Sequence, residues 1–143
     1  MTDPTPIPSL LFSDLVIREQ GTGKLSFVGA FNHILAPGFP FQTPFFFVTV
    51  FITNIQGPLD PIPTTMTISE KGSGHVIFSA SGNVGFKEIV QRATVIEIPF
   101  PVPGCRFDRP GTYEAVLLIN NERIVARDFT VSLPLSHTPS PQP

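Results

Sequence analysis

One cysteine and three histidines are the residues of this chain that most readily do nucleophilic or metal chemistry. Cys105 is the single cysteine and stands between Gly104 and Arg106. A neighbouring arginine can lower the pKa of a thiol toward the reactive thiolate. Cysteine is also a small apolar residue that loops often bury, and no Cys-His motif accompanies it. We therefore expect no catalytic residue in this chain, and we expect Cys105 to be dispensable for function.

The histidines do not follow the spacing of a metal site. His33, His75 and His137 form no His-x-x-x-His pair, and no Cys-x-x-Cys pair is present. A zinc site would require the fold to bring histidines together with a carboxylate, and Asp60 and Asp108 are too isolated in sequence to indicate calcium. The sequence therefore predicts no metal ion and no cofactor.

Acidic residues give no sign of acid–base catalysis either. Asp14 is the one acid within an otherwise apolar stretch, and such a residue either faces solvent, caps a turn or lies buried at a functional site. Residues 20–24 (Gln-Gly-Thr-Gly-Lys) faintly resemble a phosphate loop but lack its glycine spacing, so they indicate a hairpin turn. We expect a protein that is not an enzyme.

Charge and hydropathy exclude two classes of partner. The net charge is −2, and the nine lysines and arginines are scattered, which argues against nucleic-acid binding. No apolar run reaches 18 residues, so no membrane-spanning helix is expected. Residues 1–17 have no basic leader, and a single cysteine forms no internal disulfide. These features predict a cytoplasmic protein.

Proline and glycine divide the chain into short segments. The 17 prolines are about 12% of the 143 residues, against an average near 5%. Proline is excluded from helix interiors and central strands, and the intervening segments are rich in valine, isoleucine, phenylalanine and threonine. The sequence predicts one all-β, immunoglobulin-like antiparallel sandwich of about 7–8 strands over residues 9–133. Disordered proline-rich tails are expected at residues 1–8 and 134–143. The expected strands are residues 10–18, 24–34, 45–54, 65–71, 75–81, 92–100, 112–119 and 123–133.

Several connections between these strands are also predicted. Residues 57–63 are expected to form a loop, and residues 83–88 are ambiguous and could hold one helical turn. Asn120 and Asn121 predict a tight turn in a C-terminal hairpin, because asparagine tolerates the left-handed conformation. The apolar positions of the last strand change parity near Arg127 and Asp128, which indicates either a β-bulge there or a different strand register.

The segment before this hairpin resembles a structural motif of sandwich proteins. Gly111 and Tyr113 form a Gly-x-Tyr at a strand start, similar to the tyrosine corner of immunoglobulin-like domains. The resemblance implies that the ring of Tyr113 is buried and that its hydroxyl bonds a backbone group upstream. Ala115 stands where antibody domains have their second cysteine, and the chain has no tryptophan. The likeness therefore concerns architecture only.

Longer segments resemble a family. Residues 13–17 (Ser-Asp-Leu-Val-Ile), 23–31 (Gly-Lys-Leu-Ser-Phe-Val-Gly-Ala-Phe), 110–113 (Pro-Gly-Thr-Tyr) and 129–131 (Phe-Thr-Val) are similar to a group of short, uncharacterised bacterial proteins. That group is a domain of unknown function with an expected β-sandwich fold. The resemblance implies a bacterial cytosolic protein and brings no activity or site residue with it.

Function is predicted from surface character alone. Charged residues are only 14%, and mean hydropathy is +0.22, so either a partner covers apolar surface or proline, serine and threonine replace charge. Phe39 and Phe41 lie in a stiff loop and either recognise a protein or plug one end of the sandwich. Val116 and Leu118 are expected outward on their strand without cover. We expect a non-enzymatic protein-interaction or structural module that forms a homo-oligomer. The alternative is a small-ligand or carbohydrate-binding sandwich that uses its end loops.

Overall fold

The computed structural model describes residues 7–54, 57–90 and 95–135, and all the regular structure that they form is β-strand. Short apolar segments between turn residues become strands, as the sequence predicts. The strands are β1 (Ile7–Arg18), β2 (Leu25–Phe31), β3 (His33–Leu35), β4 (Phe41–Gln42), β5 (Phe46–Thr53), β6 (Gly57–Glu70), β7 (Val76–Val90), β8 (Ile96–Val102), β9 (Arg106–Phe107), β10 (Gly111–Ile119) and β11 (Glu122–Ser132). No helix among these residues is long and apolar enough to cross a membrane.

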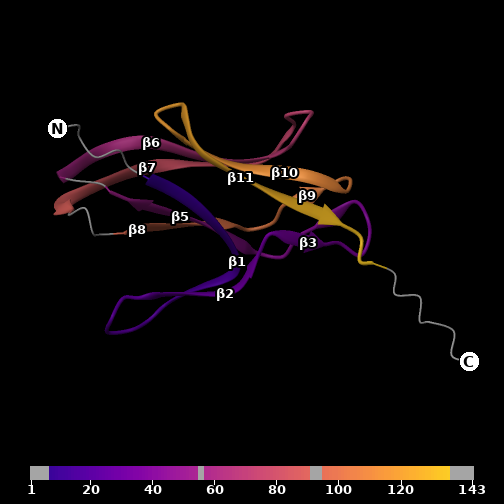
Figure 1. The fold of residues 1–143 in the computed structure, drawn as a ribbon, viewed down its shortest axis with the longest axis horizontal. Coiled ribbons are helices and arrows are strands. Elements are labelled where there is room, and N and C mark those ends of the chain that lie inside the picture. The colour runs from indigo at the N-terminus through magenta and orange to yellow at the C-terminus, as the bar shows by residue number, and fades with distance from the viewer. Residues whose placement is uncertain (1–6, 55–56, 91–94, 136–143) are drawn as a thin grey trace, which may run out of the picture.

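Two curled sheets make up most of the molecule (Figure 1). Sheet A has the order β2-β1-β5-β8, and sheet B has the order β3-β11-β10-β6-β7. Strands β4 and β9 form a separate two-stranded pair. The all-β class is confirmed. The expectation of an antiparallel fold is wrong at one place, because β3 pairs with β11 in parallel.

The core lies between the inward faces of the two sheets. Alternate residues point inward along each strand, so Phe12 on β1 and Val48 and Val50 on β5 meet sheet B and are fully buried. Met66 and Ile68 are the corresponding fully buried residues of β6. Burial of each such side chain contributes about 1.5–3 kcal/mol of transfer free energy, and this holds the sheets together.

The segment expected to be one strand at residues 24–34 is two strands in different sheets. Phe31 pairs with Phe12 in sheet A, and two residues later His33 pairs with Thr130 in sheet B. Asn32 lies between them, and its backbone oxygen accepts a hydrogen bond from the N–H of Thr130 at 3.2 Å. The chain therefore passes from one sheet to the other within one residue.

Strands β6 and β7 are longer than the sequence predicts. The loop expected at residues 57–63 is the first half of β6, and the helical turn considered for residues 83–88 is part of β7. Both expectations are wrong for one reason. Strand β10 pairs with β6 only from Thr64 onward, so residues 57–62 pair with β7 alone and form a sheet edge. Proline is tolerated at an edge, and two of the three register shifts between β6 and β7 lie in this irregular segment.

The C-terminal hairpin is confirmed. Strands β10 and β11 pair antiparallel, and Asn120 and Asn121 join them with φ angles of 53° and 64°. The bulge is not at Arg127, since the register shifts instead between Leu117 and Leu118 and passes over Ile124. Arg127 breaks the apolar parity because it occupies an inward position. Its guanidinium lies 5.4 Å from the ring centroid of Phe12.

The ends of the domain differ slightly from the prediction. Ile7 and Pro8 belong to β1 and pair with Thr53 and Ile52, so the N-terminal tail expected at residues 1–8 extends two residues too far. Residues 1–6 and 136–143 of the expected tails, and residues 92–94 of an expected strand, lie outside the described residues. The later part of that strand is β8, which continues through Pro99 and Pro101 at the edge of sheet A.

Candidate functional site

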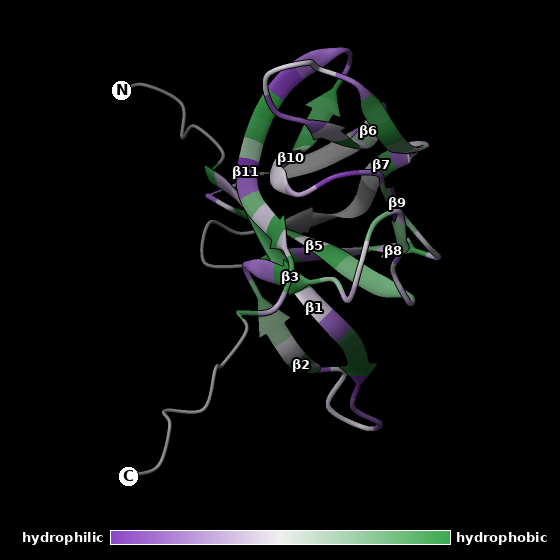
Figure 2. Ribbon diagram, turned by 90° about the vertical axis from the view of Figure 1, so that its right-hand side faces the viewer, coloured by the Kyte–Doolittle hydropathy of each residue, from purple (hydrophilic) through white to green (hydrophobic). Residues whose placement is uncertain are grey.

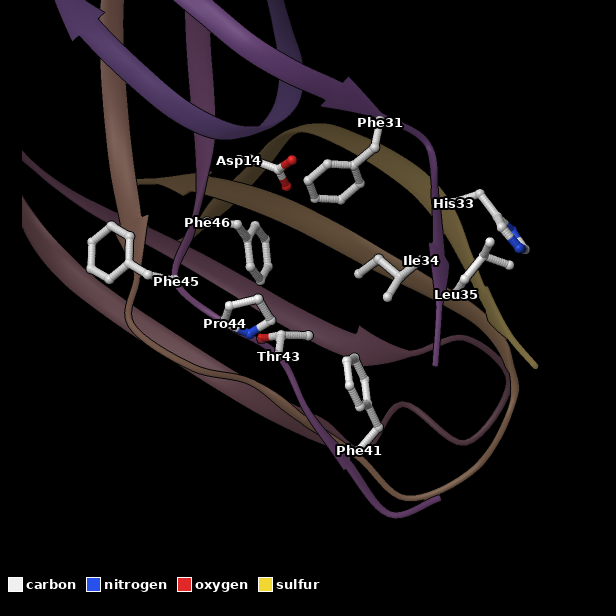
Figure 3. Close-up of a pocket in the computed structure, with 10 residues that line it drawn as sticks. All are labelled: Asp14, Phe31, His33, Ile34, Leu35, Phe41, Thr43, Pro44, Phe45 and Phe46. Carbon is white, nitrogen blue, oxygen red and sulfur yellow. The ribbon is translucent and has the colours of Figure 1, made fainter. Parts of the chain in front are cut away.

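A pocket of about 370 Å³ opens at the end of the molecule where the chain passes from β2 to β3 (Figure 3). Its other wall comes from the segment that runs from β4 to the start of β5. The lining residues are Asp14, Phe31, His33, Ile34, Leu35, Phe41, Thr43, Pro44, Phe45 and Phe46. A volume of this size lies within the usual range of small-molecule sites, about 300–1,000 Å³, and apolar lining with few polar groups is typical of them.

Aromatic rings form much of the pocket wall. The rings of Phe31 and Phe46 meet edge to face with centroids 5.6 Å apart, and Phe31 also stacks on buried Phe12 at 5.9 Å. Phe45 points away from the other lining side chains and packs against Phe47 (Figure 3). Because Phe31 and Phe46 pack on the core, this part of the wall is preformed.

The carboxylate of Asp14 faces this aromatic wall (Figure 3). Asp14 is exposed, so it lies at the mouth of the pocket. Gly29 lies opposite Asp14 on the neighbouring strand β2 and has a φ of 70°. A Cβ on Gly29 would lie 2.3 Å from Oδ2 of Asp14, so any other residue there would displace the carboxylate from this position. Sequence analysis singled out Asp14 but missed Gly29, although a glycine within an apolar strand signals a close approach.

The other polar side chains of the wall already have partners. Nδ1 of His33 shares a hydrogen bond with the hydroxyl of Thr130, and Nε2 shares one with the hydroxyl of Ser132 at 2.9 Å. The hydroxyl of Thr43 accepts a hydrogen bond from the N–H of Cys105 at 2.9 Å. The described residues offer no hydrogen bond or ion pair to the Asp14 carboxylate. This carboxylate is therefore the polar group of the wall that is available to a ligand.

Cys105 is not activated by its arginine neighbour. Its side chain is 1% exposed, and burial raises the pKa of the thiol to about 12. Arg106 instead pairs with Asp108 at 2.9 Å. The backbone of Cys105 accepts a hydrogen bond from the N–H of Thr43, so this residue ties the β4–β5 connection to the segment before β9. The possibility of a thiolate promoted by Arg106 is wrong, since Cys105 has a structural position.

His33 lies in β3 and His75 lies just before β7, at opposite edges of sheet B. His33 is held by β11, and His75 is exposed directly before β7, after the turn that follows β6. His137 lies outside the described residues. Within residues 7–54, 57–90 and 95–135, no group of three or more histidine, cysteine, aspartate or glutamate side chains could hold a metal ion.

The four residues predicted to form an interaction surface are partly or fully buried. Phe39 and Phe41 are partly buried and pack against the core, which matches the plug interpretation, and Phe41 also lines the pocket. Val116 is only 7% exposed, so the expectation that it lacks cover is wrong. It lies on β10 between Ala126 of β11 and Thr67 of β6, which shield it. Leu118 is half-buried.

The predicted structural residues lie at turns. Tyr113 is 1% exposed, and its hydroxyl donates a hydrogen bond of 2.6 Å to the carbonyl oxygen of Arg109. Gly111, with a φ of 153°, begins β10 in a conformation that favours glycine. Asn120 and Asn121 form the hairpin turn already described.

The apolar surface that sequence analysis expected on β10 is found on sheet A instead. Its outer face, the side opposite buried Phe12 in the strand register, carries exposed Ile7, Leu15 and Ile17 of β1 and Val28 of β2. Figure 2 shows hydrophobic residues along β5 and at the end of β1. The half-buried side chains of this face are Leu11, Phe47, Phe51 and Pro99. Glu97 is the charged residue among the described side chains that the register places on this face.

Part of this surface belongs to a hairpin with little support. Strand β5 pairs with β1 only as far as Ser13, so residues 14–18 pair with β2 alone. This hairpin extends away from sheet B in both views (Figures 1 and 2). Phe27 lies on the hairpin face opposite Val28, and its ring meets Phe51 of β5 at 5.4 Å, so this contact links that face of the hairpin to the rest of sheet A. Leu15 and Ile17 remain 50% exposed on it.

The solved structures that resemble this chain share 15–18% sequence identity with it, and two of them are much larger proteins. The alkylpurine DNA glycosylase AlkC of Pseudomonas fluorescens matches at 15% identity, a TM-score of 0.45 and 71% coverage of this chain. The chain spans only 28% of that protein. A β-glucuronidase of glycoside hydrolase family 2 matches at 15% identity and a TM-score of 0.38, with 71% of this chain and 12% of that one covered. A Bordetella pertussis protein assigned as ApaA matches at 18% identity and a TM-score of 0.41, with 94% and 98% covered.

Comparison with families gives a clearer result. A search of curated proteins finds no match to the chain. The model of a family of unknown function, DUF6941, matches residues 8–132, which include all but the first residue of the region from β1 to the end of β11. The chain therefore belongs to the DUF6941 family of unknown function.

Proposed function

We propose that this protein is a non-enzymatic interaction module that self-associates through the outer face of sheet A. The observation that carries the proposal is the exposed apolar set Leu15, Ile17 and Val28 on a hairpin of only two strands. A two-stranded hairpin is marginal in water, and contiguous apolar surface of this kind marks contact sites. A second copy of the same face would cover these side chains and support the hairpin.

Face-to-face association is favoured over the pairing of edges. Strand β8 forms one edge of sheet A and carries Pro99 and Pro101, which have no backbone N–H to donate to a further strand. At the opposite edge, Gly29 of β2 has a positive φ that departs from regular strand geometry. The surface of sheet A that remains is the apolar face itself.

Sedimentation equilibrium at micromolar concentration tests this function. We expect a mass above that of the monomer for the natural chain, and a monomer mass for the double variant Leu15→Glu, Ile17→Glu. Burial of a charge in an apolar interface costs several kcal/mol, which is enough to separate most dimers. Val76→Glu is the matched control, because Val76 is equally exposed, at 51%, but lies on β7 of sheet B.

Two results would count against self-association. A monomer mass for the natural chain at every concentration would remove its basis. Equal loss of association in Val76→Glu would show that added charge, and not the outer face of sheet A, is responsible.

Three further properties belong to this proposal. We infer an immunoglobulin-like architecture, which the hydrogen bond from Tyr113 to Arg109 supports. We also infer a bacterial, cytoplasmic protein without nucleic-acid or membrane partners. The free, buried thiol of Cys105 and the scattered positive charges support these inferences.

The second candidate function is the binding of a small ligand in the pocket beside Asp14. The specific observation in its favour is a preformed aromatic wall with one unengaged carboxylate. Carbohydrate is a poor fit to this wall, since sugar faces stack mainly on tryptophan and tyrosine and the wall contains phenylalanine.

A further inference from the structure

The pocket beside Asp14 has a composition that selects a particular ligand chemistry. Its walls are phenylalanine, proline, isoleucine and leucine side chains, with the carboxylate of Asp14 at the mouth. None of the described residues that line it is a lysine or an arginine. The side chains of His33 and Thr43 are engaged in hydrogen bonds with β11 and with Cys105. The free electrostatic feature of the pocket is therefore a single negative charge.

The position of this charge is built into sheet A. Gly29 leaves the space over the β2 backbone that the Asp14 carboxylate fills, because a Cβ there would lie 2.9 Å from Cγ and 2.3 Å from Oδ2. The carboxylate thus faces Phe31 and Phe46 across the pocket mouth (Figure 3). An ammonium group at this place would form an ion pair with the Asp14 carboxylate and would also contact the negative face of an aromatic ring.

We propose that the pocket binds a small organic cation, an ammonium group carried on an apolar body. The ammonium would donate hydrogen bonds to Asp14, and the apolar body would lie among Phe31, Phe41 and Phe46. This inference rests on the second candidate function and is independent of self-association through sheet A. An anion is disfavoured because it would meet Asp14 without any cation in the wall to offset the repulsion.

Three probes of similar size separate charge from apolar fit. They are phenethylammonium, the neutral 2-phenylethanol and the anionic 3-phenylpropanoate, each titrated into the full-length ¹⁵N-labelled chain. We expect amide shifts at Asp14, Gly29 and Ile34, and an affinity for phenethylammonium about tenfold above that for 2-phenylethanol. The weakest binding is expected for 3-phenylpropanoate.

Two variants locate the charge. In Asp14→Asn, which keeps the shape at an exposed position, phenethylammonium should lose about tenfold in affinity while 2-phenylethanol is unchanged. Glu97→Gln removes one negative charge from the outer face of sheet A and serves as the control, so its affinities should equal those of the natural chain. Should Asp14→Asn fail to fold, the order of the three probes on the natural chain still decides the matter.

The possible failures are distinguishable. Equal affinity for the ammonium and the alcohol would overturn the cation proposal and leave ligand binding standing. Absence of binding by all three probes at about 1 mM would overturn both. An equal effect of Glu97→Gln and Asp14→Asn would assign the preference to net charge and overturn the role of Asp14.

Discussion

The hydroxyl of Tyr113 donates a hydrogen bond to the carbonyl oxygen of Arg109, four residues earlier, across 2.6 Å. The ring itself is packed edge to face against Phe107, with centroids 4.7 Å apart, and stacks on Phe129. Burial is the main reason that the pKa of Tyr113 lies above its ordinary value. One side chain thus joins the loop before β10 to the aromatic centre of the core.

Replacement of this tyrosine measures the hydrogen bond alone. Tyr113→Phe keeps the ring and leaves the Arg109 carbonyl without its partner, so we expect a loss of about 1 kcal/mol in the free energy of unfolding. Urea denaturation should show a lower midpoint with an unchanged slope. An unchanged midpoint would mean that the hydrogen bond makes no net contribution.

Thr49 offers a change in the opposite direction. Its side chain is fully buried on the outer face of sheet A, between Leu11 of β1 and Pro99 of β8, and its hydroxyl has no hydrogen-bond partner among the described residues. Thr49→Val replaces an unsatisfied hydroxyl by a methyl group and should raise the free energy of unfolding by about 1 kcal/mol. Thr64→Val is the matched control. Thr64 is 2% exposed and donates to the carbonyl of Ile62, so its replacement should destabilise the protein.

We expect the free energy of unfolding to fall at alkaline pH because the thiol of Cys105 is buried. The folded pKa of about 12 exceeds the ordinary 9.0, so the folded state holds the thiol proton more tightly than the unfolded state does. Stability from this group is complete below pH 9 and is lost as the pH rises toward 12. Urea midpoints at pH 8 and pH 10.5 should fall more in the natural chain than in Cys105→Ala. An equal fall of the urea midpoint in the natural chain and in Cys105→Ala would contradict a buried neutral thiol. Rapid selective alkylation of Cys105 at neutral pH would contradict it as well.

Arg127 should not be replaceable by lysine. Its guanidinium donates to the carbonyl oxygen of Leu10 and to the side-chain oxygen of Asn32, and it lies over the ring of Phe12. Lysine cannot make this planar forked contact, so Arg127→Lys should cost about 1–2 kcal/mol of stability in thermal or urea unfolding. Arg123→Lys on the same strand is the control. Arg123 makes an exposed ion pair with Glu114, and its change should be nearly neutral; equal effects of the two variants would refute a special role for Arg127.

Local patterns in the sequence predict much of this fold because turn residues and apolar stretches mark strands and their ends locally. The hairpin at Asn120 and Asn121 and the buried strand at residues 46–53 follow from turn chemistry and from apolar residues on both faces. Arg127 shows where such patterns mislead. A charged residue at an inward position looks like a change of face, because its hydrogen-bond partners are 117 and 95 residues away in sequence.

The candidate site was the harder part to predict. Asp14 is visible in the sequence as an acid within an apolar strand, but its relation to Gly29 depends on the register of β1 and β2. Phe41 and Phe46 join the pocket only because the chain turns between β4 and β5 and because β3 changes sheets. The exposure of Leu15 follows from the point at which β5 begins, which no local pattern specifies.

The place of β11 in sheet B also bears on when the protein can fold during its synthesis. It is the last strand that the structure describes, yet it lies between β3 and β10 and its Arg127 reaches back to Leu10 of β1. The hairpins β1–β2 and β6–β7 need only neighbouring segments and can form early, whereas the parallel β3–β11 pair joins residues 97 apart. A chain growing from its N-terminus therefore cannot complete its core until β11 has left the ribosome, and until then β10 has an unpaired edge.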